Sequence, residues 1–339
     1  MRLTSLGLLA CWLLACGDSG SAGGAGGNGA GPGDTSTGTA SGAGGQGGVN
    51  VVGGAGGTAD AGGGAGPVGG EGGGGGSPPI DTVRIVAANL SSGKNQSYDL
   101  GHGIRILQGI DPDIILIQEL NYGDDSEQDI IELVDLICGG GCEYVRGPDA
   151  NIPNGIISRY PIIDAGSWTD TQVSDRDFVW AQIDVPGDTD LWAVSVHLLG
   201  SGAGAREGEA TQLMALFDEN IPDGDFLMLG GDFNTDNRQE ACLTVLDPLF
   251  DITGPYPVDQ NDLDTTSGNR SKPYDWLLAD AELDPLEVPV VLDTTTFENG
   301  AVIDTRVYVP LSDIAPAQVD DSAAFAMQHM AVIKDFILE

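Results

Sequence analysis

The chain has 339 residues, with 51 Asp and Glu against 13 Lys and Arg, and its formal net charge is −38 at pH 7. This charge excludes the broad basic surface of proteins that bind nucleic acid tightly and without specificity, so a polyanionic substrate would depend on bound cations and a few local arginines. The residues that follow the first 79 are enough for one large domain.

The N-terminus has the layout of a secretory signal. Arg2 precedes an apolar run over 6–14 that is too short to span a bilayer. Residues 13–16, Leu-Leu-Ala-Cys, resemble the bacterial lipobox, which implies removal of residues 1–15 and lipidation of Cys16. A cleaved, soluble secreted protein is the alternative. Both interpretations predict export. If Cys16 is lipidated, we expect a membrane-anchored protein of the bacterial cell envelope or surface.

Residues 16–79 are expected to be a disordered tether. The segment is rich in Gly, Ala and Ser and contains few charged or large apolar residues, so burial could not offset the entropy lost on ordering. A Gly-rich coil of this length spans roughly 40–45 Å. Runs such as Gly-Gly-Glu-Gly-Gly break the strict three-residue repeat of collagen. The folded domain is therefore expected over 80–339.

Short Val- and Ile-rich runs alternate with segments of helical spacing along this domain. We expect strands over 83–88, 113–117, 155–158, 178–185, 191–196, 226–229, 274–278 and 329–337. We expect helices over 98–109, 126–137, 205–220 and 238–246. Asp236, three residues before Gln239, is the expected cap of the last helix. Mixed alternation of this kind predicts a layered α/β sandwich.

Polar residues stand at the ends of the expected strands, where α/β proteins place their sites. They are Asn89, Gln118, Glu119, His197, Asp232, Asn234, Asp275 and His329. The chain has only three histidines, and two of them are in this set. A single histidine is more often structural, but two among carboxylates and carboxamides favour a functional site.

Seven short segments occur in the order and approximate spacing of the endonuclease/exonuclease/phosphatase superfamily. They are AAN, IQE, GIISRYPI, SVHL, GGDFN, YDWLLA and QHMAV, and GGDFN is the most specific. The resemblance covers about 81–339. It implies a DNase I-like α/β fold, a four-layer sandwich of two packed mixed β-sheets flanked by helices, with the active site at one edge. It also implies metal-dependent hydrolysis of phosphate esters.

The resemblance gives two residues a role in binding metal. Glu119 matches the carboxylate that binds the metal in the superfamily, and Asn89 is expected to support Glu119 in binding it. Hard oxygen ligands of this kind suit Mg²⁺ or Mn²⁺ better than zinc.

The same resemblance gives five residues catalytic roles. Asp232 and Asn234 match positions that place the attacking water and bind the phosphate; an ordinary turn after a strand is the alternative. His329 matches the histidine that contacts the scissile phosphate, and Asp275 the carboxylate that orients it. His197 is a candidate acid for the leaving oxygen, but spacing does not decide which histidine is acid and which is base.

Four further residues are candidates for contact with the substrate phosphate. Asn154 precedes GIISRYPI at a position that faces the phosphate in the family; a turn asparagine is the alternative. Arg176 is the preferred cationic contact, with Arg270 and Lys272 as weaker candidates. Exposed solubilising cations are the alternative reading for all three.

One motif departs from the family. The last motif is usually Ser-Asp-His, whose aspartate helps to bind metal, but here it is Met327, Gln328 and His329. If Gln328 replaces that ligand, it offers one neutral oxygen in place of a carboxylate. We therefore expect a weaker or displaced metal, with activity favoured by millimolar Mg²⁺ or by Mn²⁺.

Cysteines and one acidic stretch complete the candidate features. Cys138 and Cys142 flank a Gly-Gly-Gly turn and are expected to form a disulfide in an exported protein. Cys242 lies among apolar residues and is expected to pack. The stretch with Asp259, Asn261, Asp262 and Asp264 could hold a structural Ca²⁺, but its spacing favours a solvated loop.

These observations favour an exported nuclease that acts on DNA or RNA. A sphingomyelinase-type phospholipase C is the first alternative, for which Trp168 and the loop 198–204 are the only apolar candidates. A phosphomonoesterase would need more cations at its site. A non-catalytic surface module is a further alternative, with Gln328 as its main argument. Substrate choice is expected to depend on the loops 200–206 and 255–272, and no protein partner is predicted.

Overall fold

The computed structural model describes residues 82–93, 96–148 and 151–338. The predicted signal sequence, Cys16 and the predicted tether lie outside the described residues. Among the residues that are described, no helix combines the length and the apolar character needed to cross a membrane.

Two mixed β-sheets form the frame of this domain. The first has the order β10-β14-β1-β2-β4-β3, with β13 also paired to β14, and the second has the order β5-β6-β7-β8-β9. The strands of the first sheet are β1 (Thr82–Ala88), β2 (Ile114–Ile117), β3 (Glu143–Arg146), β4 (Gly155–Ser158), β10 (Glu287–Val288), β13 (Ala301–Ile303) and β14 (Ala331–Ile337). The strands of the second are β5 (Ile162–Trp168), β6 (Phe178–Ile183), β7 (Leu191–His197), β8 (Phe226–Asp232) and β9 (Asp275–Ala279). Each sheet contains one parallel pair, β1 with β2 and β7 with β8, among antiparallel neighbours.

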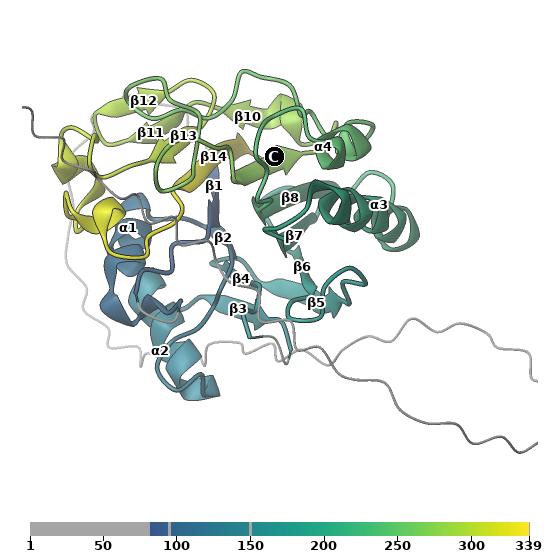
Figure 1. Cartoon of the computed structure of the whole chain (residues 1–339), viewed down its shortest axis with the longest axis horizontal. Helices are drawn as coiled ribbons and strands as arrows, with labels where there is room; N and C mark the ends of the chain where they lie inside the picture. Colours follow the sequence, from purple (N-terminus) through teal and green to yellow (C-terminus); the bar gives the residue numbers. More distant parts are fainter. Residues whose placement is uncertain (1–81, 94–95, 149–150, 339) are drawn as a thin grey trace, which may run out of the picture. The chain divides into compact units, whose positions relative to one another are not determined.

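Helices cover the outer face of each sheet. The first sheet carries α1 (His102–Ile110) and α2 (Glu127–Cys138), and the second carries α3 (Ala203–Asn220) and α4 (Ala241–Leu246). Figure 1 shows α1 and α2 on one side of the strands and α3 and α4 on the other. A small hairpin of β11 (Val290–Leu292) and β12 (Thr295–Phe297) packs with the first sheet.

Strand alternation explains the layers. In β1, Val86 and Ala88 join the core beneath α1 and α2, whereas Ile85 and Ala87 join the core between the two sheets. Since successive side chains of a strand point to opposite faces, a strand that is apolar throughout can bury both. A third core lies between the second sheet and α3 and α4. Three cores separate four layers, and the predicted fold class is confirmed.

The expected strands are present, with ends that differ by a few residues, but several others were missed. β3 has only four residues, and β5 is an edge strand whose first residues are largely exposed, so neither shows a strong apolar pattern. The predicted cap of the last helix was wrong. α4 begins after Glu240, and the Asp236 carboxylate instead accepts a hydrogen bond from Lys272 Nζ at 2.5 Å.

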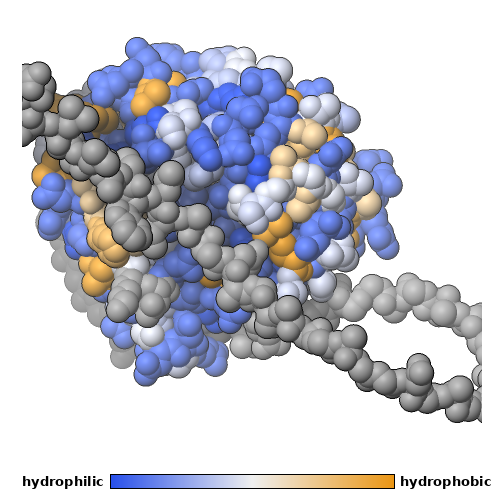
Figure 2. Space-filling view, in the orientation of Figure 1, coloured by the Kyte–Doolittle hydropathy of each residue, from blue (hydrophilic) through white to orange (hydrophobic). Residues whose placement is uncertain are grey.

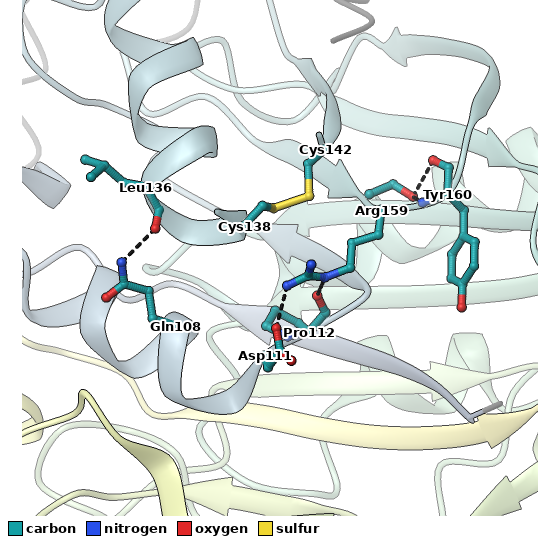
Figure 3. Close-up of a disulfide and its surroundings, with 9 residues drawn as sticks. Gln108, Asp111, Pro112, Leu136, Cys138, Cys142, Arg159 and Tyr160 are labelled. Carbon is teal, nitrogen blue, oxygen red and sulfur yellow. Dashed lines mark hydrogen bonds and ion pairs between the residues drawn. A yellow bond between two sulfur atoms is a disulfide. The ribbon is translucent and has the colours of Figure 1, made fainter. Parts of the chain in front are cut away.

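A disulfide joins the end of α2 to the start of β3. Figure 3 shows the bond between Cys138 and Cys142. Their Cα atoms lie 6.3 Å apart. The three glycines between them all have φ between 75° and 93°, a left-handed conformation that costs glycine little. In the same view, Gln108 of α1 donates a hydrogen bond to the Leu136 carbonyl of α2 at 2.7 Å. Cys242 is free and buried in the core under α3 and α4.

Candidate active site

Strand ends from both sheets meet at one edge of the sandwich. Asn89 directly follows β1, and Glu119 follows β2 after one further residue. In the second sheet, His197 and Asp232 are the last residues of β7 and β8 and stand opposite each other in the parallel ladder. Asp275, the first residue of the antiparallel strand β9, stands opposite Asp232 on its other side. The register thus places three of the predicted residues in one row.

Asp232 is the centre of this row. Its side chain is 1% exposed, and Oδ2 lies 3.2 Å from His197 Nε2 and 3.4 Å from His329 Nε2. The side-chain amides of Asn89 and Asn234 each donate to Oδ2 at 3.1 Å, and the Asn234 backbone N–H donates to Oδ1 at 2.9 Å. Burial, together with the nearby Asp275 charge, raises the pKa of Asp232 to about 7, although His329 acts in the opposite direction.

His329 is held as a cation. Its Nδ1 lies 3.1 Å from each carboxylate oxygen of Asp275. Burial disfavours the imidazolium, but the charges of Asp232 and Asp275 outweigh it and raise the pKa of His329 to about 10. The ring of Tyr274 packs on it with centroids 5.5 Å apart. At neutral pH this histidine is therefore a positively charged hydrogen-bond donor.

His197 has the opposite character. Burial, followed by the charges of Arg176 and His329, lowers its pKa well below the ordinary value. Its Nδ1 is buried and has no hydrogen-bond partner among the described residues. A neutral imidazole donates a proton poorly, so the resting site does not favour the predicted role of His197 as the acid for the leaving oxygen.

Glu119 and Asn89 offer oxygen atoms suited to a hard cation. Glu119 Oε2 accepts a hydrogen bond from Ser91 Oγ at 2.8 Å, and Asn89 Oδ1 is buried without a partner among the described residues. Glu119 and Asn234 also have left-handed backbones, with φ of 52° and 53°. This conformation is strained for glutamate, and such strain concentrates at functional sites. The donor set fits Mg²⁺ or Mn²⁺ better than a softer metal.

A second group of potential ligands overlaps this one. Ligand atoms of Asp232, Asp275 and His329 all lie within 4.8 Å of one another. His329 and Asp275 are already engaged with each other, and a protonated imidazole would repel a cation. We therefore regard this trio as proton-handling groups and Glu119 with Asn89 as the better cation ligands.

Arg176 lies near His197, and Asn154 contacts the segment that carries Arg176. The Asn154 side-chain amide donates to the Asp177 carbonyl at 2.7 Å, and its Oδ1 is buried without a partner among the described residues. Arg176 is 9% exposed and forms two hydrogen bonds with Asp175, at 2.9 and 3.0 Å. Its charge is close enough to lower the pKa of His197.

Three predicted residues lie outside the cluster. Arg270 Nη1 contacts carboxylates of Asp259 and Asp304, both at 2.7 Å, so its charge is used within the fold. Lys272 is part-exposed and paired with Asp236, and it lies over the Tyr274 ring. Gln328 is exposed, one residue before the buried His329.

The acidic stretch that begins at Asp259 is a solvated loop only in part, since Asn261 and Asp262 are exposed but Asp259 is buried. Asp259 is 3% exposed, and its Oδ2 is occupied by the Arg270 guanidinium. Asp264 accepts a hydrogen bond from Arg238 at 2.9 Å. Arginines, rather than a calcium ion, balance these two carboxylates.

Several supporting residues carried no sequence signal. Ser91 donates a hydrogen bond to Glu119, and Thr266 accepts one from the Asp275 backbone at 2.8 Å. The Tyr98 hydroxyl donates to the Ala88 carbonyl at 3.3 Å. Gly231 is required by close packing, since a Cβ there would lie 2.1 Å from the Val196 carbonyl oxygen. The second glycine of GGDFN thus lets β7 and β8 run side by side into the site.

A buried pair of carboxyl groups lies behind His197. Glu209 of α3 is fully buried, and both its oxygens accept the Leu199 backbone N–H at 3.1 Å. Its side chain lies beside that of Asp170, which is 2% exposed. Burial, followed by this contact, raises the pKa of Glu209 to about 8, so Glu209 is mostly protonated at neutral pH. The pair anchors the chain two residues after His197.

Comparison with known proteins agrees with this architecture. The model of the endonuclease/exonuclease/phosphatase family matches residues 97–313. No curated protein matches the sequence. Among solved structures, a functionally unknown conserved protein from Enterococcus faecalis V583 has 13% identity and a TM-score of 0.52, covering 74% of this chain and 98% of its own. Two endonuclease/exonuclease/phosphatase family proteins each have 15% identity. The structure from Bacteroides thetaiotaomicron has a TM-score of 0.51, and the match covers 76% of this chain and 98% of that protein. The structure from Bacteroides vulgatus has a TM-score of 0.50, and the match covers 76% of this chain and 100% of that protein.

These structures are similar in fold alone, whereas the family model matches well over half of the chain. Members of the family generally hydrolyse phosphate esters, usually with a divalent metal. The match includes Glu119, His197, Asp232 and Asp275, while Asn89 and His329 lie beyond its ends. The chain belongs to the endonuclease/exonuclease/phosphatase family.

Proposed function

We propose that this protein is an exported nuclease that hydrolyses phosphodiester bonds of DNA or RNA with Mg²⁺ or Mn²⁺. The observation that carries the proposal is the buried Asp232 between a neutral histidine and a cationic one, since a carboxylate with a pKa of about 7 can accept a proton near neutral pH. Export and lipid anchoring at Cys16 are part of the proposal and rest on the sequence of residues 1–16.

The residues present suggest a division of labour. Asp232 takes a proton from the attacking water as a new P–O bond forms and the bond to the leaving oxygen breaks; the departing alkoxide is protonated from solvent. His329, held by Asp275, donates a hydrogen bond to a phosphoryl oxygen and balances its charge. The Asn234 amide orients Asp232, and Arg176 adds a positive charge beside His197. A divalent cation held by Glu119 and Asn89 would neutralise charge on the phosphoryl oxygens.

The competing substrates gain little support. Trp168 was a candidate for contact with a lipid surface. Its ring stacks on that of Trp180, with centroids 5.8 Å apart, and packs against the core under α3. It is therefore not a free aromatic anchor for a membrane. A phosphate monoester carries a second negative charge, and Arg270 and Lys272, which could have met it, are paired with carboxylates.

The test is release of acid-soluble nucleotides from DNA and from RNA in Mg²⁺, Mn²⁺ or EDTA, with His329→Ala as the control. We expect metal-dependent release that the variant loses. Absence of release in every metal would refute the nuclease, and parallel assays with sphingomyelin and phosphate monoesters would then identify a different ester. Inactivity on all of these would favour the non-catalytic module.

A further inference from the structure

Phe325 is the most exposed large hydrophobic side chain of the described residues, at 86%. It lies four residues before His329, so the two Cα atoms are at most about 14 Å apart. A single exposed apolar residue is common on protein surfaces and by itself carries no meaning. Here the backbone that carries the ring and the groups around it add independent evidence.

The turn that carries Phe325 is pinned on both sides. Before it, the buried Asp321 carboxylate binds His102 and Arg105 of α1. Within it, the Met327 N–H donates to the Ala324 carbonyl at 3.0 Å. Met327 is only 7% exposed, so this side chain turns into the core while Phe325 stays outside.

The backbone beside the ring is also unusual. Ala326 has φ of 74°, a left-handed conformation that costs an L-residue energy and persists only where the surroundings enforce it. After the turn, the Gln328 carbonyl accepts the Gly268 N–H at 2.6 Å. The ring is therefore presented by a fixed backbone and not by a loose loop.

Cationic side chains border the same edge of the molecule. Arg306 Nη1 donates to the Gly268 carbonyl at 2.9 Å, and Gly268 is the residue that binds Gln328. Lys272 is in the same loop as Gly268 and lies over the Tyr274 ring, which packs on His329. Both cations are also paired with carboxylates, Arg306 with Asp304 and Lys272 with Asp236. The exposed ring beside a phosphate-ester site therefore carries the inference, because aromatic side chains stack on the bases of single-stranded nucleic acid.

We propose that Phe325 stacks on a nucleobase next to the cleaved bond, and that the preferred substrate is nucleic acid with unpaired bases. This inference rests on the proposed nuclease function. Bases of a duplex are stacked on one another and do not offer a free face, whereas those of a single strand do. A lipid surface fits less well, because insertion needs a larger apolar patch. The face drawn in Figure 2 is mainly hydrophilic, with its apolar residues in separate groups.

The experiment compares the full chain with Phe325→Ala, Phe325→Trp and a control, Ile163→Ala, in which a 54% exposed side chain of β5 is removed. The substrates are a single-stranded oligonucleotide, its duplex, and an oligomer of equal length with tetrahydrofuran in place of every base. We expect Phe325→Ala to lower kcat/KM on the single strand about 5- to 20-fold and to leave the base-free oligomer unchanged. The Trp variant and the control should stay within about twofold of the wild type.

A binding measurement separates this inference from the proposed function. Fluorescence anisotropy of the same labelled oligomers in EDTA reports stacking without cleavage. If the wild type cleaves nothing, the nuclease proposal fails, while preferential binding of the oligomer with bases, lost in Phe325→Ala, would still support stacking. Equal effects on both oligomers, or no effect on either, would overturn the inference. Loss of binding to phosphatidylcholine–sphingomyelin vesicles, with oligonucleotide binding unchanged, would overturn it in favour of a lipid surface.

Discussion

The domain contains two groups of charged residues, each with buried carboxylates, that differ in how completely the charges are paired. The first is the site cluster, formed by His197, Asp232, Asp275 and His329. The second, which we call the arginine network, consists of Asp259, Arg270, Asp304 and Arg306. Both contain nearly inaccessible carboxylates, so burial alone does not distinguish a functional group from a structural one.

The arginine network balances its charges. Burial opposes ionisation of Asp304, but hydrogen bonds from Arg306 and Arg270 outweigh it and hold the pKa of Asp304 below its ordinary value. In the site cluster the pKa of Asp232 rises to about 7, that of His329 rises to about 10, and that of His197 falls. Polar atoms of His197 and the adjacent Asn89 also remain without partners among the described residues. Shifted pKa values, together with buried polar atoms that lack a hydrogen-bond partner, therefore distinguish the site cluster as the group that can do chemistry.

The largest expected effect is from Asp232→Asn. The amide cannot accept a proton from water, so we expect kcat on the cleaved nucleic acid to fall about 10²- to 10⁴-fold. Stability should fall much less than activity: burial already disfavours the ionised carboxylate, but an amide nitrogen would replace one of the oxygens that accept hydrogen bonds from Asn89 and Asn234. Steady-state kinetics and thermal unfolding of the same preparation measure both effects. Retained activity would show that Asp232 does not handle the proton.

The opposite pattern is expected for Arg270→Met. Removing this guanidinium leaves Asp259 and Asp304 buried without their shared partner, which should lower the free energy of unfolding by about 3–5 kcal/mol. Chemical denaturation measures the loss, and kcat of the folded protein should change less than tenfold. If activity were lost while stability was kept, Arg270 would instead be the phosphate contact that the sequence suggested.

This contrast also shows what sequence reasoning could reach. Strand ends follow from apolar periodicity, and the family motifs supplied the rest of the expectation for Asp232 and His329. The partners of Arg270 are 11 and 34 residues away and meet it only after folding, so no local pattern separated a structural arginine from a substrate ligand. Likewise, no local pattern indicated the strained backbone of Glu119.

Secondary structure was predictable to a similar degree and for a similar reason. Long buried strands such as β1 and β7 have continuous apolar runs, whereas the short strands β10 and β13 depend on pairing with the distant strand β14. The Asp236 cap failed because a distant lysine, Lys272, binds the same carboxylate. Tertiary contacts thus decided the features that local sequence left open.

Glu209→Gln tests an intermediate case, a buried acid that supports the site without joining it. The folded pKa of about 8 lies above that of an unfolded glutamate, so the folded state binds the proton more tightly. Its contribution to stability is complete below about pH 4.5 and is lost as pH rises to about 8. Glutamine mimics the protonated form, since its amide can donate to Asp170 while its oxygen accepts from Leu199.

We therefore expect Glu209→Gln to be more stable than the wild type by about 2 kcal/mol at pH 9 and nearly equal to it at pH 5. Thermal unfolding across this range measures the difference. The exposed Glu207 of the same helix provides the matched control, and Glu207→Gln should follow the wild type at every pH. A constant offset between Glu209→Gln and the wild type would rule out a raised pKa of Glu209 in the folded state.

The smallest effect is expected from Gln328→Asp, which tests whether residue 328 contributes a ligand to the metal. Gln328 immediately precedes His329 but is exposed, unlike the buried Glu119 and Asn89. An aspartate there would add a negative charge at the entrance and a harder oxygen ligand. We expect the Mg²⁺ concentration for half-maximal activity to fall about threefold to tenfold, with little change in stability. If the variant has an unchanged metal dependence, Gln328 lies outside the metal's coordination shell. If activity of the wild type is already saturated at micromolar Mg²⁺, Gln328 does not weaken metal binding.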